Sequence, residues 1–204
     1  DKLHNQGLKQ AIVVVPERSI GGSFADEPLS RGGFYWDWKV APQWNLCNAP
    51  GIDELRVAKS KVDAVRKFLE STDKALVCTH ATFRFAVEEL GIEAFDNRLI
   101  AIDEFHHVSA NPDNKLGGQL SAFIERDKVH LVAMTGSYFR GDSEAVLAPA
   151  EEAKFETITY TYYEQLNGYR WLKSLDIGYF FYTGKYVDAI AKVLDPALKT
   201  IIHI

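Results

Sequence analysis

The chain has 204 residues, of which 47% are hydrophobic and 25% are charged. These proportions suit a folded domain with a sizeable core, and they exclude a disordered, collagen-like or coiled-coil chain. With 23 basic and 28 acidic residues, the net charge is −5. The chain therefore has no broad basic field for nucleic acid, and any such contact must come from a few local groups.

Cysteine usage and hydropathy bear on the cellular setting. Cys47 and Cys78 are far apart in the sequence, which favours neither a zinc site nor a disulfide framework and is typical of a reducing compartment. No apolar run approaches the ~20 residues of a membrane span, and the polar first residues are unlike a signal peptide. We expect a cytoplasmic chain with no membrane partner.

Short apolar runs alternate with stretches of helical periodicity along the chain. Most of the runs are continuous, which is typical of strands buried on both faces of a parallel sheet. This alternation predicts an α/β fold with a mostly parallel sheet flanked by helices. In chain order we expect a strand at 11–15, a helix at 52–70, a strand at 75–78, a helix at 82–90, a strand at 99–102, a helix around 116–124, a strand at 129–134, a helix at 185–194 and a strand at 200–204.

Two segments depart from this rhythm. Residues 155–162 alternate apolar and polar side chains, which predicts a more exposed strand, at a sheet edge. Residues 26–51 are rich in proline, glycine and large aromatic side chains, which predicts a long loop or insertion. Loops of this length are often functional. We expect this one to cover the core and not to stack nucleic-acid bases, because large aromatic side chains more often pack than bind.

The sharpest feature is an apolar strand that ends in two adjacent acids, Asp103 and Glu104, followed by Phe105 and His106. In an open α/β sheet, ligands bind at the carboxyl ends of the strands. Asp103 is then placed to hold Mg²⁺ through a carboxylate oxygen. Glu104 is placed to orient or deprotonate the water that attacks a γ-phosphate. The same acids could instead cap the following helix, because acidic side chains favour helix N-termini.

Five segments together resemble the first RecA-like lobe of superfamily 2 helicases of the DExH type (DEAD/DEAH box), particularly the branch that includes the motor subunits of type III restriction enzymes. Residues 13–18 (VVVPER) resemble motif Ia, 76–83 (LVCTHATF) motif Ib, 103–106 (DEFH) motif II, 131–137 (LVAMTGS) motif III, and 199–204 (KTIIHI) the opening strand of the second lobe. The likeness spans most of the chain. It implies a fragment of an ATP-dependent helicase or translocase that uses Mg²⁺ with ATP and moves on DNA in preference to RNA.

The resemblance also implies roles for single residues in the nucleotide site. Asp103 corresponds to the magnesium ligand and Glu104 to the water-activating acid. His106 corresponds to the residue that couples the nucleotide site to motif III, where Thr135 and Ser137 would be its hydroxyl partners. Taken alone, the segment containing Thr135 and Ser137 also fits an ordinary turn after a strand.

Arg18 and Thr79 correspond to groups that hold nucleic-acid phosphates in motifs Ia and Ib. Each has a simpler structural interpretation. Arg18 could cap or solvate a helix, and Thr79 could be the N-cap of the helix that follows it.

One departure from the family concerns the phosphate-binding loop. The sequence contains no G-x-x-x-x-G-K-[ST] segment, whose backbone amides and lysine cradle phosphates. In the family this loop precedes motif Ia, so we expect the parent chain to extend beyond both ends of these residues. We predict that 1–165 form the first lobe with motifs Ia to III and that 166–204 form a connector and the first strand of the second lobe. We expect the isolated fragment to be inactive as an ATPase.

The residues leave two other functions open. One is a metal-dependent phosphohydrolase or nuclease centred on Asp103, Glu104, His106 and His107, which predicts tight divalent metal binding without nucleotide. The other is a non-catalytic RecA-like module that serves as a docking surface. It predicts that Glu104→Gln leaves the function of the parent intact.

Overall fold

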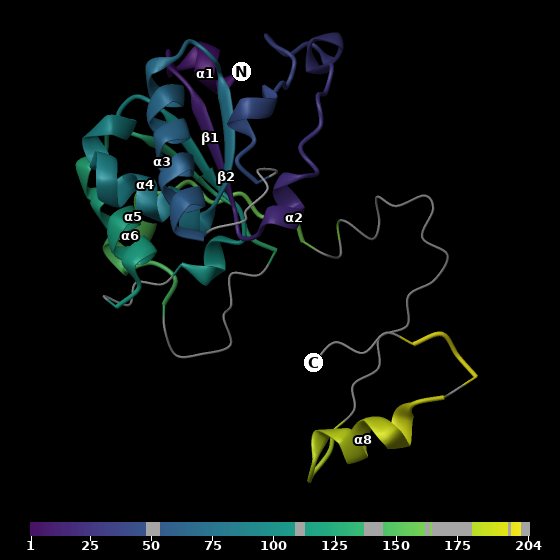
Figure 1. Ribbon diagram of the computed structural model, residues 1–204. Helices are drawn as coiled ribbons and strands as arrows, with labels where there is room; N and C mark the ends of the chain where they lie inside the picture. Colours follow the sequence, from purple (N-terminus) through teal and green to yellow (C-terminus); the bar gives the residue numbers. More distant parts are fainter. Residues whose placement is uncertain are drawn as a thin grey trace. The chain divides into compact units, whose positions relative to one another are not determined.

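The structure, a computed structural model, describes residues 1–47, 54–108, 113–136, 145–161, 164, 181–195 and 197–200. The chain divides into two compact units, Asp1–Glu156 and Thr157–Ile204. The first unit holds the sheet and its helices (Figure 1). Among the described residues, no helix combines the length and hydropathy needed to cross a bilayer.

Four parallel strands form the sheet of the first unit, in the order β2-β1-β3-β4. The strands are β1 (Ala11–Val15), β2 (Ala75–Thr79), β3 (Leu99–Ile102) and β4 (His130–Ala133). The central strand β1 pairs with both β2 and β3. The four strands predicted from continuous apolar runs in this unit are confirmed, with differences of a single residue at the ends of β2 and β4.

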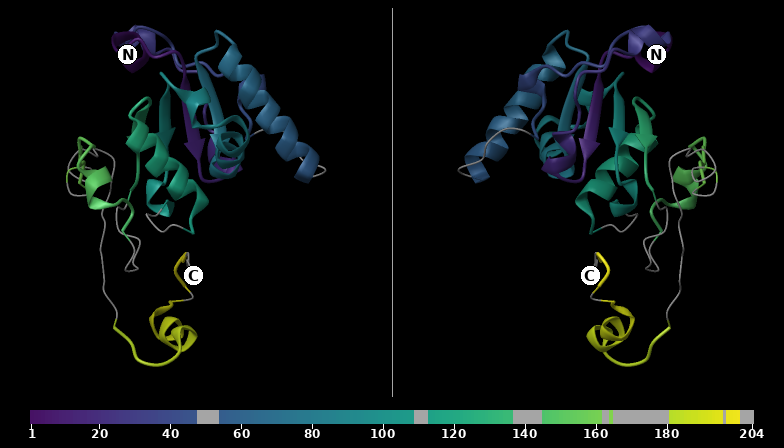
Figure 2. Two further views of the ribbon diagram at one scale, coloured as in Figure 1. Left: turned by 90° about the vertical axis from the view of Figure 1, so that its left-hand side faces the viewer. Right: turned by 90° about the vertical axis from the view of Figure 1, so that its right-hand side faces the viewer.

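Each connection between successive strands contains a helix, because neighbouring parallel strands cannot be joined by a tight turn and need a crossover connection. The main helices are α3 (Glu54–Glu70), α4 (His80–Leu90) and α5 (Lys115–Arg126). They lie along one side of the sheet (Figure 1 and Figure 2). This α/β arrangement is RecA-like and confirms the predicted fold class. Shorter elements are α1 (Lys2–Asn5), α2 (Arg18–Gly21) and α6 (Pro149–Glu152), with 3-10 turns at Leu29–Gly32, Pro42–Trp44, Ile92–Phe95 and Phe105–His107.

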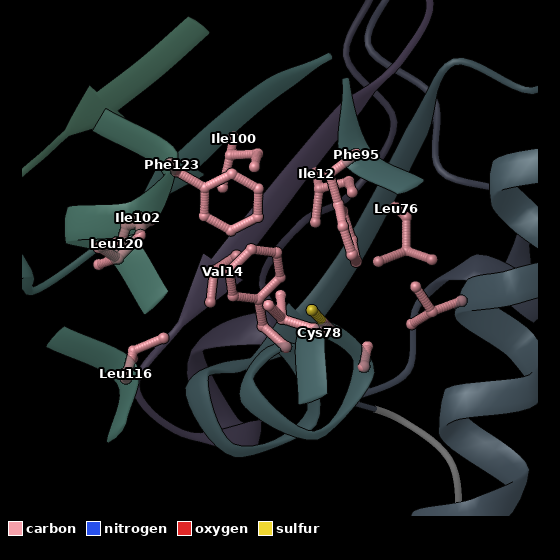
Figure 3. Close-up of a cluster of buried hydrophobic side chains, with 14 of the residues drawn as sticks. Ile12, Val14, Leu76, Cys78, Phe95, Ile100, Ile102, Leu116, Leu120 and Phe123 are labelled. Carbon is pink, nitrogen blue, oxygen red and sulfur yellow. The ribbon is translucent and has the colours of Figure 1, made fainter. Parts of the chain in front are cut away.

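Alternate residues of the strands face two different apolar clusters. Ile12 and Val14 of β1 face the larger cluster, which α3, α4 and α5 complete (Figure 3). Val13 and Val15 face a smaller cluster with Cys47, onto which Ile20 packs. Trp38 and Val40 of residues 26–51, called the aromatic segment below, pack onto the same cluster. Because both faces of β1, β2 and β3 are buried, these strands carry apolar side chains at almost every position, which explains the continuous runs in the sequence.

Helix α4 begins two residues earlier than predicted because Thr79 caps it. The Thr79 side chain accepts a hydrogen bond from the Thr82 backbone amide. An N-cap residue satisfies an amide that the helix itself cannot. The helix ends at Gly91, whose positive φ of 79° suits a residue without a Cβ.

The aromatic segment covers the core only in part. Trp44 is buried, packs edge-on against Phe68 and donates its indole N–H to Asp73 Oδ2 at 2.6 Å. Trp38 packs against the smaller cluster. The expected cover is thus seen at these two tryptophans, whereas Phe34, Tyr35 and Trp36 at the tip of the segment are exposed.

One predicted strand is wrong. Residues 155–161 form no strand, and Ile158 is 89% exposed. An alternating pattern produces a strand only where a neighbouring sheet edge accepts its backbone. Here the Thr161 amide donates to the Glu164 carboxylate at 2.7 Å and not to a strand.

In the second unit, α8 (Tyr186–Val193) confirms the helix predicted at 185–194. The strand predicted at 200–204 lies outside the described residues apart from Thr200. The predicted boundary between residues 165 and 166 stays a prediction.

Candidate functional site

The predicted site residues follow the strands directly and therefore lie at the carboxyl-terminal edge of the sheet. Arg18 begins α2 after β1, which lies at this edge (Figure 1). Thr79 ends β2, and Asp103 follows β3. Thr135 comes two residues after β4. This is the edge at which open α/β sheets bind ligands.

The backbone of Asp103 is fixed from two sides. Its amide donates to the Val14 carbonyl of β1 at 2.9 Å. Its own carbonyl oxygen lies 2.8 Å from Nε2 of His80, the first residue of α4. The half-buried carboxylate accepts the Glu104 amide through Oδ1 at 3.0 Å. Asp103 thus stands in a defined position at the end of the central strands.

Glu104 turns the chain with a left-handed backbone, at φ 49° and ψ 47°. The turn buries Phe105, whose amide donates to the Met134 carbonyl beyond β4 at 2.9 Å. Glu104 makes no side-chain capping bond to the 3-10 turn that follows. Its carboxylate oxygen Oε2 instead lies 3.1 Å from Nδ1 of His106. The capping interpretation therefore finds no support at Glu104.

His106 and Thr135 are brought together as the resemblance implies. Nδ1 of His106 lies 2.8 Å from Oγ1 of Thr135, across the ends of β3 and β4. The rings of His106 and His107 are 4.3 Å apart. Ser137 lies outside the described residues. The catalytic and coupling roles of these side chains stay predictions.

Sequence reasoning missed His80. A carbonyl oxygen can only accept, so Nε2 of His80 carries a hydrogen and donates it to Asp103 O. Burial, more than any neighbouring group, lowers the pKa of His80, because a buried site disfavours the charged form of the ring. A single histidine at a helix start has no spacing that predicts this contact. Only the strand order places it opposite Asp103.

Thr79 is an N-cap, as its simpler interpretation suggests. The side chain is buried, and Oγ1 accepts the Thr82 amide at 3.3 Å and lies 3.1 Å from Oγ1 of Thr82. The exposed part of this helix start is Ala81. The first backbone amides of a helix have no acceptor within the helix. Any phosphate contact here therefore falls to these amides more readily than to the Thr79 hydroxyl.

Arg18 is exposed and begins α2. Its Nε donates to the Cys47 carbonyl at 3.1 Å. The Asn45 amide group donates to the Gly21 carbonyl at 3.0 Å, which holds the same helix to the same segment. Gly21 permits this contact, because a Cβ there would lie 2.2 Å from the Cys47 sulfur. Arg18 is thus set at the carboxyl-terminal edge by packing as well as by its place after β1.

The side chains at this edge suit a magnesium ion that arrives with a nucleotide. Mg²⁺ is commonly bound through one or two carboxylates together with substrate phosphates and water. Asp103 offers one such carboxylate. Within the part of the chain that the structure describes, no three His, Cys, Asp or Glu side chains are grouped to hold a metal by themselves.

A search of known proteins found a relative whose sequence is similar over the whole of this chain. Over all 204 residues, the chain is 53% identical to a protein of Bacillus subtilis (strain 168) named "Putative ATP-dependent helicase YeeB". The chain spans about a third of the length of that relative, since the alignment covers 33% of it. A scan against protein-family models gave no match. A search of solved structures gave no significant match.

Proposed function

We propose that this chain is part of the first RecA-like lobe of an ATP-dependent helicase or translocase of the DExH type, similar to the motor subunits of type III restriction enzymes. The observation that carries the proposal is the acid pair at the end of β3, next to the contact between His106 and Thr135. The relative's name supports a helicase assignment. In this proposal the parent protein is cytoplasmic.

The chain supplies only part of the ATP site. Residues 1–165 would form the first lobe with motifs Ia to III, and 166–204 would lead into the second lobe. The phosphate-binding loop and the rest of the second lobe would come from other parts of the parent chain. Since phosphoryl transfer depends on positioning and charge stabilisation, the 204 residues alone should not hydrolyse ATP.

Asp103 would hold Mg²⁺, which neutralises charge on the β- and γ-phosphates when it is bound with ATP. The two backbone contacts of Asp103 fix the direction of its carboxylate. Glu104 would orient water for in-line attack on the γ-phosphate and accept its proton. The left-handed turn at Glu104 sets its carboxylate beside His106.

His106 would report the state of the nucleotide site to motif III. Its ring touches both the Glu104 carboxylate and the Thr135 hydroxyl. A change in the contacts of Glu104 can therefore alter the hydrogen bond at the end of β4. Coupling of this kind needs two distinct arrangements of the same contact.

Nucleic acid, DNA in preference to RNA, would bind along the same edge of the sheet. Arg18 and the first amides of α4 are the groups that suit phosphate oxygens. Such contacts carry no base information, so binding should be independent of sequence and should weaken with salt. The net charge of −5 agrees with a narrow track of this kind and not with a broad basic face.

Substitution of Glu104 in the full-length parent tests the proposal. Glu104→Gln keeps the size of the side chain and removes the charge that activates water. We expect nucleotide binding to persist and the rate of hydrolysis to fall about 10²-fold or more. Phosphate release with Mg²⁺ and single-stranded DNA is the measurement, with fluorescent nucleotide binding measured in parallel.

Glu93→Gln is the matched control, because Glu93 lies in the 3-10 turn before β3, at the opposite end of that strand. It should leave hydrolysis unchanged. Asp103→Asn should raise the Mg²⁺ concentration needed for half-maximal rate. Normal hydrolysis by Glu104→Gln would show that the acid pair is not catalytic and would favour the docking module.

A further inference from the structure

The loop that carries the acid pair is held on both sides. On the β4 side, Phe105 N–H donates to Met134 O, and His106 contacts Thr135. On the β2 side, the contact is that of His80 with the Asp103 carbonyl. The resemblance accounts for the first side through motif III. It assigns nothing to the second.

The strand order explains how His80 reaches this loop. β2 and β3 are not neighbours, because β1 lies between them. His80 directly follows β2, in the register where Thr79 is opposite Val15 of β1. Its ring therefore passes the end of β1 to reach the first residue after β3. The contact joins the start of α4 to the acid pair without any intervening side chain.

The two ends of this contact belong to different parts of the proposed site. His80 is the first residue of α4 and precedes the exposed Ala81, where helix amides would meet phosphate. Asp103 carries the carboxylate proposed for magnesium, and its amide is already held by Val14 O. The sheet fixes the peptide group before Asp103, through its N–H, whereas the peptide group between Asp103 and Glu104 is held at its carbonyl by His80 of α4.

We propose that His80 is a positioning residue that couples nucleic-acid binding at the start of α4 to the acid pair of the ATP site. The inference rests on the proposed function. Phosphate bound at the helix start holds the first turn of α4. The imidazole then holds the Asp103 peptide, and with it the direction of the Asp103 and Glu104 side chains. Nucleic acid thereby raises the rate of ATP hydrolysis through one hydrogen bond.

Two polar substitutions separate the hydrogen bond from the bulk of the side chain. In His80→Gln, the amide nitrogen lies as many bonds from Cα as the imidazole Nε2, so a donor remains in reach of Asp103 O. In His80→Asn the amide nitrogen lies one bond closer to Cα and cannot reach Asp103 O. In the full-length parent, we expect stimulation of ATPase by single-stranded DNA to fall roughly fivefold or more in His80→Asn. His80→Gln should retain most of the stimulation.

The measurement is the ratio of kcat with and without single-stranded DNA, with thermal unfolding of each variant recorded. His130→Asn is the matched control, since His130 is half-buried at the start of β4, at the far end of the sheet. It should leave the ratio unchanged. Rescue by Gln but not Asn is a result that a purely structural role would not give.

Other outcomes overturn the inference in distinguishable ways. If DNA stimulates the parent and His80→Asn keeps the full ratio, His80 does not couple the two sites. If His80→Asn lowers both rates equally, the side chain only supports the fold. If the unaltered parent has no DNA-stimulated ATPase, the proposed function fails, and the role of His80 fails with it.

Discussion

At Glu104 the backbone takes the left-handed conformation, with φ 49°, which residues other than Gly, Asn and Asp rarely adopt. The surrounding structure imposes it. Asp103 N–H is bound to β1, and Phe105 N–H is bound beyond β4, so the chain must turn sharply between them. Strain of this kind collects at functional sites, where side-chain direction matters more than local stability.

The strain at Glu104 leads to a prediction about stability. Asn tolerates the left-handed region better than Gln, and both substitutions remove the carboxylate beside His106. We expect Glu104→Asn to have a free energy of unfolding about 1 kcal/mol higher than that of Glu104→Gln. Urea denaturation of the two variants under identical conditions measures this difference. Equal midpoints and slopes would show that the turn is not strained.

Residues of the candidate site were predictable to different degrees. The acid pair could be recognised because a buried strand followed by adjacent acids is a local pattern. The approach of His106 to Thr135 followed from the family resemblance. His80 could not be found, because its contact depends on which strands lie next to each other. At Thr79 the structure shows the N-cap of its simpler interpretation, and the phosphate contact that the motif implies stays a prediction.

At the scale of elements, Gln10 and Arg98 form a buried polar pair that hydrogen-bonds to the backbone at the C-terminal end of α3. Gln10 donates through Nε2 to the carbonyls of Phe68, Ser71 and Asp73. Arg98 donates through Nε to Gln10 Oε1 at 2.7 Å and through its terminal nitrogens to the carbonyls of Leu69, Ala94 and Asp96. Burial lowers the pKa of the Arg98 guanidinium, which Asp96 opposes. The two side chains join α3 to the amino ends of β1 and β3.

We expect Arg98→Met to destabilise the chain by about 2–4 kcal/mol. Met keeps much of the apolar stem but leaves one side-chain oxygen and three carbonyls without their donor, and an unpaired buried polar group is costly. Arg66→Met is the control. Arg66 pairs with Asp63 and Glu89 on the surface, and its loss should leave the free energy of unfolding nearly unchanged because exposed ion pairs contribute little. Urea unfolding compares the two, and similar losses would contradict the assignment.

The elements were predicted well where burial is complete and poorly where it is not. β1 and β3 match the apolar runs residue for residue, because nearly all of their positions are buried. Residues 155–161 carried an equally regular pattern, yet no strand accepts them. An alternating pattern of apolar and polar side chains indicates which side chains could be buried together. It does not indicate whether a partner strand is present.

At the scale of the whole molecule, charge limits how nucleic acid can bind. A net charge of −5 opposes long-range attraction to phosphate, so in the proposed function the affinity of this chain comes from groups at the carboxyl-terminal edge. Arg18 is set there by α2 and by its contact with Cys47. The aromatic tip around Tyr35 belongs to the opposite edge, because Tyr35 stacks on His4 of α1 and its amide donates to Asp1.

The last prediction compares two arginines at these opposite edges in the full-length parent. Arg18→Ala and Arg31→Ala remove the same charge, but Arg31 lies in the aromatic segment. If Arg18 neutralises a phosphate, DNA binding by the Arg18→Ala variant releases one counterion fewer than DNA binding by the unaltered protein. The slope of log K against log salt should then fall by roughly one unit, about equally for all DNA sequences. Arg31→Ala should leave the slope unchanged, because a distant exposed charge is screened within about 10 Å at 0.1 M salt. Fluorescence anisotropy at several salt concentrations measures both slopes. An unchanged slope for Arg18→Ala, or an altered preference among sequences, would remove Arg18 from the nucleic-acid track and leave α2 with a structural role.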